Sequence, residues 1–171
     1  KEDLIICQFG NHTGKISWLD AGDPRKENIL VYRPGARKAE IVDVNKDGKL
    51  DLVIGKRNGT LAYFQNTGTI TQANFSVTPT IDTLGKINVR SRDDSYGNAT
   101  PFIFDLDNDG IFEALIGSYS KSVILFTDVT SNPNIKARRF ASIFKDNTAG
   151  NTDSIMQGVY TSVSVAILIM I

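Results

Sequence analysis

The sequence predicts an all-β fold built from β-propeller-type blades. Two stretches, 39–55 and 99–117, each read as an apolar strand, an acidic turn and a second apolar strand. Their acidic turns begin at Asp43 and Asp105, which are 62 residues apart. No apolar period of 3.6 residues persists long enough to predict a helix. A repeat of this length suits a blade of four short strands. The chain holds 171/62, or about 2.8, such periods, so we expect about three units of an incomplete propeller.

The expected strands are short and lie between turn signals. In order, they cover 3–7, 14–20, 29–32, the two halves of 39–55, 60–65, the two halves of 99–117, and 122–126. Asn58-Gly59 separates two β-rich runs, and this dipeptide is the strongest short-range signal for a hairpin. Polar stretches fill the gaps, with weaker strand signals near Phe75 and Ile87 and a weak apolar segment at 140–144.

The repeat divides residues 1–171 into one continuous region of four units. These are a partial unit at about 1–38, complete units at 39–98 and 99–160, and a truncated unit at 161–171. Thr161–Ala166 lies 62 residues beyond Ala99–Phe104, but Ile167 stands where a third acidic turn would begin. Closed propellers usually need at least about four blades. We therefore expect a fragment of a longer protein, in which a frameshift or a truncation explains the missing aspartate. The alternative is an ordinary hydrophobic strand at this point.

The composition excludes several classes of protein. Nineteen Lys and Arg residues balance nineteen Asp and Glu residues, whereas nucleic-acid binders usually show a basic excess. No segment approaches the roughly 18 consecutive apolar residues of a membrane-spanning helix, so we expect no membrane insertion. The one cysteine, Cys7, rules out a disulfide within this sequence. These properties indicate an ordinary globular chain without nucleic acid as a partner.

The two acidic turns have the spacing of a metal-binding loop. Side chains with oxygen atoms occupy alternate positions and close each turn: Asp43, Asn45, Asp47 and Asp51, then Asp105, Asp107, Asp109 and Glu113. Gly48 and Gly110 allow the sharp reversal that brings the last carboxylate round. Carboxylates gathered in this way repel one another unless a cation binds, and Ca²⁺ best tolerates flexible oxygen ligands. We expect the backbone carbonyls of Lys49 and Ile111 to complete two Ca²⁺ sites.

Other interpretations of these turns differ in what they require. An EF-hand needs a glutamate at loop position 12, but Ile54 and Ile116 stand there, and the flanking segments read as strands. The remaining alternative is a pair of polar hairpin turns that bind no metal. The duplication between similar strands favours the metal-binding interpretation.

Two longer segments resemble FG-GAP/VCBS-type repeats, the calcium-bearing blades of integrin α-chain propellers and of many secreted bacterial proteins. They are AEIVDVNKDGKLDLVIGKRNGTLAYFQNTG at 39–68 and ATPFIFDLDNDGIFEALIGSYSKSVILF at 99–126. The resemblance implies that the alternating loop oxygens bind Ca²⁺ and that Gly55 and Gly117 follow the second strand. The first unit departs from the pattern, since Cys7 stands at the glycine position. The resemblance also implies an extracellular or cell-surface setting, within a longer bacterial secreted or surface protein.

The sequence offers no catalytic constellation, so we expect a protein that is not an enzyme. His12 is the one histidine, and no G-x-S-x-G motif accompanies it. We expect a calcium-stabilised module for adhesion or protein interaction, whose protein or glycan ligand is unknown. The alternative is an accessory or carbohydrate-binding part of a secreted carbohydrate-active enzyme. Trp18, Tyr63 and Phe64 would then stack on a sugar, although packing between blades explains them more simply.

Overall fold

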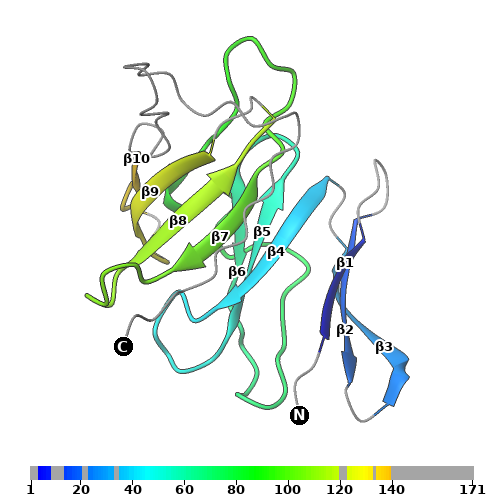
Figure 1. The fold of residues 1–171 in the computed structure, drawn as a ribbon. Helices are drawn as coiled ribbons and strands as arrows, with labels where there is room; N and C mark the ends of the chain where they lie inside the picture. The colour runs from blue at the N-terminus through cyan, green and yellow to red at the C-terminus, as the bar shows by residue number, and fades with distance from the viewer. Residues whose placement is uncertain are drawn as a thin grey trace, which may run out of the picture.

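The fold is all-β, as the sequence predicts, and consists of three antiparallel sheets (Figure 1). The computed structural model describes residues 4–8, 14–20, 23–32, 35–119, 123–132 and 134–139. Within these ranges, the one helical element is a single 3₁₀ turn, Leu84–Lys86. None of the described residues forms a helix that is long and apolar enough to cross a membrane.

The first sheet has the order β1-β2-β3, with β1 at Leu4–Gln8, β2 at Lys15–Asp20 and β3 at Asp23–Tyr32. The predicted strand 29–32 is therefore too short at its N-terminal end. The added residues are largely polar, and they pair with β2 in spite of two irregularities in register. Glu27 on β3 accepts hydrogen bonds from Ser17 at 2.6 Å and from Lys15 at 2.7 Å. An apolar pattern cannot reveal a strand whose partners are polar.

The second sheet has the order β4-β5-β6, with β4 at Ala36–Val42, β5 at Asp51–Lys56 and β6 at Leu61–Phe64. The predicted Asn58-Gly59 hairpin joins β5 to β6, and Gly59 has the positive φ of 91° that this turn requires. Isolated bridges join Tyr63 to Ile81 and Thr60 to Asn88. These bridges take the place of a fourth strand in this blade.

The third sheet has four strands in the order β10-β9-β8-β7. Its bounds are Thr100–Phe104 for β7, Phe112–Gly117 for β8, Val123–Val129 for β9 and Arg138–Arg139 for β10. The strand pairs β4/β5 and β7/β8 are the two strand–turn–strand stretches found in the sequence. The apolar segment 140–144 and the truncated unit 161–171 lie outside the described residues, and the unit boundaries stay a prediction.

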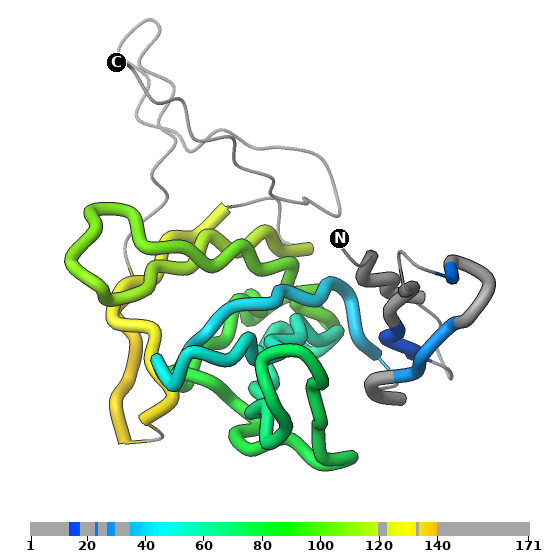
Figure 2. The backbone as a smooth tube through the Cα atoms, turned by 90° about the horizontal axis from the view of Figure 1, so that it is seen from below, coloured from blue at the N-terminus to red at the C-terminus, as the bar shows by residue number. Residues whose placement is uncertain are grey.

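The weak strand prediction near Phe75 is wrong, because residues 65–80 form an irregular loop. The side chain of Asn66 organises this loop by accepting the backbone N–H groups of Gly68 and Asn74 through Oδ1, at 2.9 and 3.1 Å. Such side-chain bonds compete with a strand ladder for the backbone groups. Near Ile87 the structure has the 3₁₀ turn and one bridge in place of a strand. Figure 2 shows the loop, in green, at the front of the molecule.

The sheets stack in chain order, and each interface joins opposite faces of the repeated sheet. One face of the second sheet packs on the third and forms the largest core cluster; its other face packs with Ile16 of the first sheet. The inner strands β4 and β7 lie against each other (Figure 1). A Cβ atom on Gly55 would lie 2.1 Å from the carbonyl oxygen of Ala99. A glycine at this point therefore permits the close approach of the two blades.

Candidate metal centre

The two acidic loops have nearly the same backbone. We call residues 43–51, between β4 and β5, the first loop, and residues 105–113, between β7 and β8, the second loop. Lys46 and Asn108 have φ of 60° and 59°, and the glycines two positions later both have φ of 82°. The loops lie at the same end of neighbouring sheets (Figure 1). They are close neighbours, since a Cβ on Gly110 would lie 3.1 Å from Lys46 Nζ.

Both loops use the first aspartate to hold the turn. Gly48 N donates to Asp43 Oδ2 at 2.8 Å, and Gly110 N donates to Asp105 Oδ2 at 2.9 Å. The fifth residue of each loop shows the same correspondence: Asp47 Oδ1 and Asp109 Oδ1 each accept the backbone N–H two residues later. The predicted loop conformation is therefore present in both units before any cation is considered.

The second loop brings three carboxylates together. Oxygen atoms of Asp105, Asp107 and Asp109 all lie within 4.8 Å of one another. Asp105 Oδ1 is buried and has no hydrogen-bond partner among the described residues. A buried carboxylate oxygen without a partner is costly unless a cation or a donor satisfies it. The residues of the second loop therefore fit a bound cation, and this cluster could hold a metal ion.

Glu113 lies at the base of the second loop, where it is 6% exposed. Its Oε2 accepts the backbone N–H of Leu106 at 2.8 Å. Burial raises the pKa of Glu113, and the charges of the three loop aspartates raise it further against the effect of that hydrogen bond. The loop aspartates thus add negative charge around this carboxyl group, and a cation at the triad would oppose their effect.

The first loop holds its side chains by internal contacts. Asp43 Oδ1 accepts the Asp47 backbone N–H at 3.1 Å, and Asp47 Oδ2 accepts Asn45 Nδ2 at 3.0 Å. Lys49 Nζ lies 3.2 Å from the same Asp47 oxygen. Desolvation opposes ionisation of Asp47, but the hydrogen bonds from Asn45 and Lys49 outweigh it and lower its pKa. The carboxylates of this loop do not form a group like that of the second loop.

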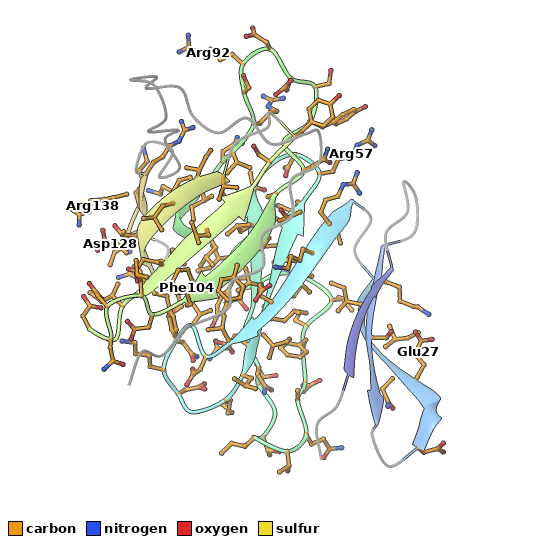
Figure 3. All side chains as sticks on the ribbon, viewed as in Figure 1. Glu27, Arg57, Arg92, Phe104, Asp128 and Arg138 are labelled. Carbon is orange, nitrogen blue, oxygen red and sulfur yellow. The ribbon has the colours of Figure 1, made fainter. Side chains whose placement is uncertain are left out.

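Asp51, which closes the first loop, is fully buried and bonded at both oxygens. Its Oδ2 accepts the hydroxyl of Tyr63 at 2.9 Å, and its Oδ1 accepts the backbone N–H of Asn66 at 2.8 Å. Burial raises the pKa of the Tyr63 phenol, and its hydrogen bond to Asp51 raises that pKa further. The phenol therefore stays protonated and donates to Asp51. In the second unit Asp128 is the counterpart of Asn66, and it pairs with Arg138 Nε at 2.7 Å (Figure 3).

The structure therefore places every predicted side-chain ligand in a loop of the expected shape, but gathers the carboxylates closely in the second loop alone. The backbone carbonyls of Lys49 and Ile111 stay predicted ligands. Sequence reasoning missed the ammonium of Lys49 and the phenol of Tyr63 as partners of loop carboxylates. A lysine within the first acidic turn was the available signal for the first of these contacts. The second joins positions twelve residues apart and had no local signal.

The aromatic residues considered for sugar stacking are largely in the core. Tyr63 and Phe64 are each 1% exposed, and the side chain of Trp18 and all of His12 lie outside the described part. Tyr96 is 42% exposed, and its ring stacks on the guanidinium of Arg57 at 3.7 Å. Arg57 and Arg92 lie toward the end of the molecule opposite the acidic loops (Figure 3). Among the described residues, packing in the core accounts for Tyr63 and Phe64.

Comparison with known proteins gives one match. Residues 43–116 match the family model described as FG-GAP-like repeat. This range begins at the first residue of the first loop and ends within β8, so it includes both loops and covers less than half of the 171 residues. The match supports the resemblance to FG-GAP repeats for this part of the chain. No curated protein and no solved structure matches the chain.

Proposed function

We propose that this region is a non-catalytic, calcium-stabilised repeat module of an extracellular or cell-surface protein, which serves adhesion or protein interaction. The observation that carries the proposal is the second loop, where oxygen atoms of three carboxylates lie within 4.8 Å of one another and Asp105 Oδ1 is buried without a hydrogen-bond partner among the described residues. The match to an FG-GAP-like repeat supports a repeat module used for interaction.

Calcium suits the chemistry of the second loop better than softer metals do. All its predicted side-chain ligands are carboxylates, whose oxygen atoms hard cations prefer, and the loop contains neither histidine nor cysteine. The residues that would hold the ion are Asp105, Asp107, Asp109, Glu113 and the carbonyl of Ile111. When bound, Ca²⁺ would neutralise the repulsion among these carboxylates and fix the turn between β7 and β8.

The expected consequence is coupling of stability to calcium concentration. Extracellular calcium modules typically bind with dissociation constants of about 10⁻⁴ to 10⁻³ M, which suits a secreted or surface protein. At a calcium concentration ten times the dissociation constant, binding to the folded state adds about 1.4 kcal/mol to the free energy of unfolding. For a chain of this size that corresponds to roughly 3–6 °C in Tm.

Calorimetric titration of the full 171-residue chain with Ca²⁺ tests the metal assignment. Asp109→Asn removes one carboxylate of the triad, so it should abolish the binding heat and the loss of Tm on addition of a chelator. Asp93→Asn is the matched control, since Asp93 is exposed and lies outside both loops; it should titrate like the unmutated chain. Absence of heat and of any chelator effect in the unmutated chain would overturn the proposal.

The interaction role needs a separate experiment because the metal does not identify the partner. The accessory or carbohydrate-binding role stays an alternative, but burial of Tyr63 and Phe64 removes two of its three proposed stacking residues. We expect no specific binding to a glycan array, with or without Ca²⁺. Saturable binding to a defined glycan would instead favour the carbohydrate-binding alternative.

A further inference from the structure

The two loops share one backbone but differ sharply in charge. The first loop carries three carboxylates and two ammonium groups, a formal charge of −1: Asp43, Lys46, Asp47, Lys49 and Asp51. The second carries four carboxylates and no ammonium group, a formal charge of −4: Asp105, Asp107, Asp109 and Glu113. A divalent cation therefore gains much less Coulomb energy from the first loop than from the second.

Among these differences in charge, the ammonium of Lys49 lies in direct contact with a carboxylate of the first loop. Its ammonium lies 3.2 Å from Asp47 Oδ2 and also donates to the backbone carbonyl of Asn66 at 2.9 Å. It thus ties the turn to the chain that follows β6, where a metal ion would otherwise tie carboxylates together. Ile111 occupies the equivalent place in the second loop; it is 42% exposed and cannot supply charge.

The carboxylate oxygens of the first loop are already satisfied. Both oxygens of Asp43 accept backbone N–H groups within the turn. Those of Asp47 accept the Lys49 N–H and the Asn45 amide, besides the contact with the Lys49 ammonium. Both oxygens of Asp51 are bonded by Tyr63 and Asn66. A cation that entered the first loop would have to displace the Lys49 ammonium and turn the Asn45 amide round. In the second loop, a cation could bind Asp105 Oδ1 without breaking a hydrogen bond to that oxygen among the described residues.

We propose that Lys49 closes the first loop in place of a metal ion, so that the second loop alone binds calcium in this pair of repeats. The inference rests on the proposed function for calcium at the second loop, and it departs from the two-site prediction made from the sequence. The internal cation makes the first loop independent of calcium concentration. The two neighbouring units therefore respond differently when calcium is removed.

Calcium stoichiometry of the full chain tests this inference. The double variant Asn45→Asp, Lys49→Ile gives the first loop the residues of the second at these two positions. We expect one Ca²⁺ per unmutated chain and two per double variant. The control Lys136→Ile makes the same substitution at an exposed lysine outside both loops and should keep one site. The reverse change, Ile111→Lys, should weaken binding to the second loop by about ten-fold or more.

The outcomes separate this inference from the proposed function. Two sites in the unmutated chain would overturn the role of Lys49 and leave the proposed function intact. No site in the unmutated chain but one in the double variant would overturn the proposed function, and with it calcium binding at the second loop, while supporting Lys49 as the group that closes the first loop. Failure of the double variant to gain a site would overturn the inference. Hydrogen exchange gives an independent readout: removal of calcium should accelerate exchange in 105–113 and leave 43–51 unchanged.

Discussion

Loss of the Tyr63 hydroxyl should destabilise the protein whether or not calcium is bound. Tyr63 Oη donates to Asp51 Oδ2 at 2.9 Å, and both residues are buried, with 1% and 0% of their surfaces exposed. In Tyr63→Phe the ring still fills the core, but one oxygen of Asp51 loses its donor. Asn66 N stays on the other oxygen at 2.8 Å, so the loop is weakened and not abolished.

The expected magnitude follows from that geometry. A hydrogen bond to a charged group contributes about 1.5–3 kcal/mol, and an unsatisfied buried acceptor costs a similar amount. We therefore expect the free energy of unfolding to fall by about 2 kcal/mol, or roughly 4–8 °C in Tm for a chain of this length. Urea unfolding with an unchanged denaturant slope would show that the effect is on stability alone.

Two comparisons make the test decisive. Tyr96→Phe is the matched control, because Tyr96 is 42% exposed and its ring contact with Arg57 does not use the hydroxyl; it should change stability by less than about 0.5 kcal/mol. The loss in Tyr63→Phe should be equal in calcium and in chelator, since Asp51 is satisfied by protein donors. A loss below about 0.5 kcal/mol, or one seen only in chelator, would refute the assignment of Asp51 as an anchor held by protein donors.

Three further variants test neighbouring features. Burial, and then the loop aspartates, raise the pKa of Glu113, so the folded chain holds this proton more tightly than the unfolded chain. The free energy of unfolding of the metal-free chain should therefore fall as pH rises from about 4.3 through the raised pKa. Urea unfolding in chelator should show that Glu113→Gln removes this fall. Lys46→Ala should strengthen calcium binding by about three- to ten-fold at low salt in a calorimetric titration, because its ammonium lies beside Gly110. Gly55→Ala should lower the free energy of unfolding by about 3 kcal/mol or more in urea, because the added Cβ would overlap the carbonyl of Ala99.

The sequence predicted those parts of the fold in which pattern and packing agree. The 62-residue offset locates β4/β5 and β7/β8, because both pairs repeat apolar residues on either side of a turn that needs glycine. It missed the N-terminal half of β3, where pairing depends on polar contacts such as Ser17 with Glu27. It also placed a weak strand near Phe75, where Asn66 takes up the backbone N–H groups. Side-chain bonds to the backbone carry no periodic signal.

The sequence predicted the conformation of both loops of the candidate site, but it did not predict which loop carboxylates are paired with a lysine. Alternating oxygens and a glycine fix the turn in both units, and the structure has both turns. Whether the carboxylates stay free depends on where a lysine side chain reaches, and spacing alone cannot give that direction. Lys49 returns onto Asp47 because the carbonyl of Asn66 lies within its reach. Residue spacing therefore predicts two equivalent metal-binding loops, whereas the contacts in the structure distinguish one loop from the other.

Stacking of the blades gives this difference a physical consequence. The acidic loops of these two units lie at the same end of neighbouring sheets and close together (Figure 1), as the approach of Lys46 Nζ to Gly110 shows. Two adjacent loops that each carried a charge of −4 would repel across a distance that salt screens only partly, since the Debye length is about 8 Å at physiological ionic strength. In this pair the first loop carries two lysines: Lys49 offsets charge within it, and Lys46 extends positive charge toward its neighbour. The lysines of the first loop thus lower the repulsion that the carboxylates of the second loop would otherwise meet.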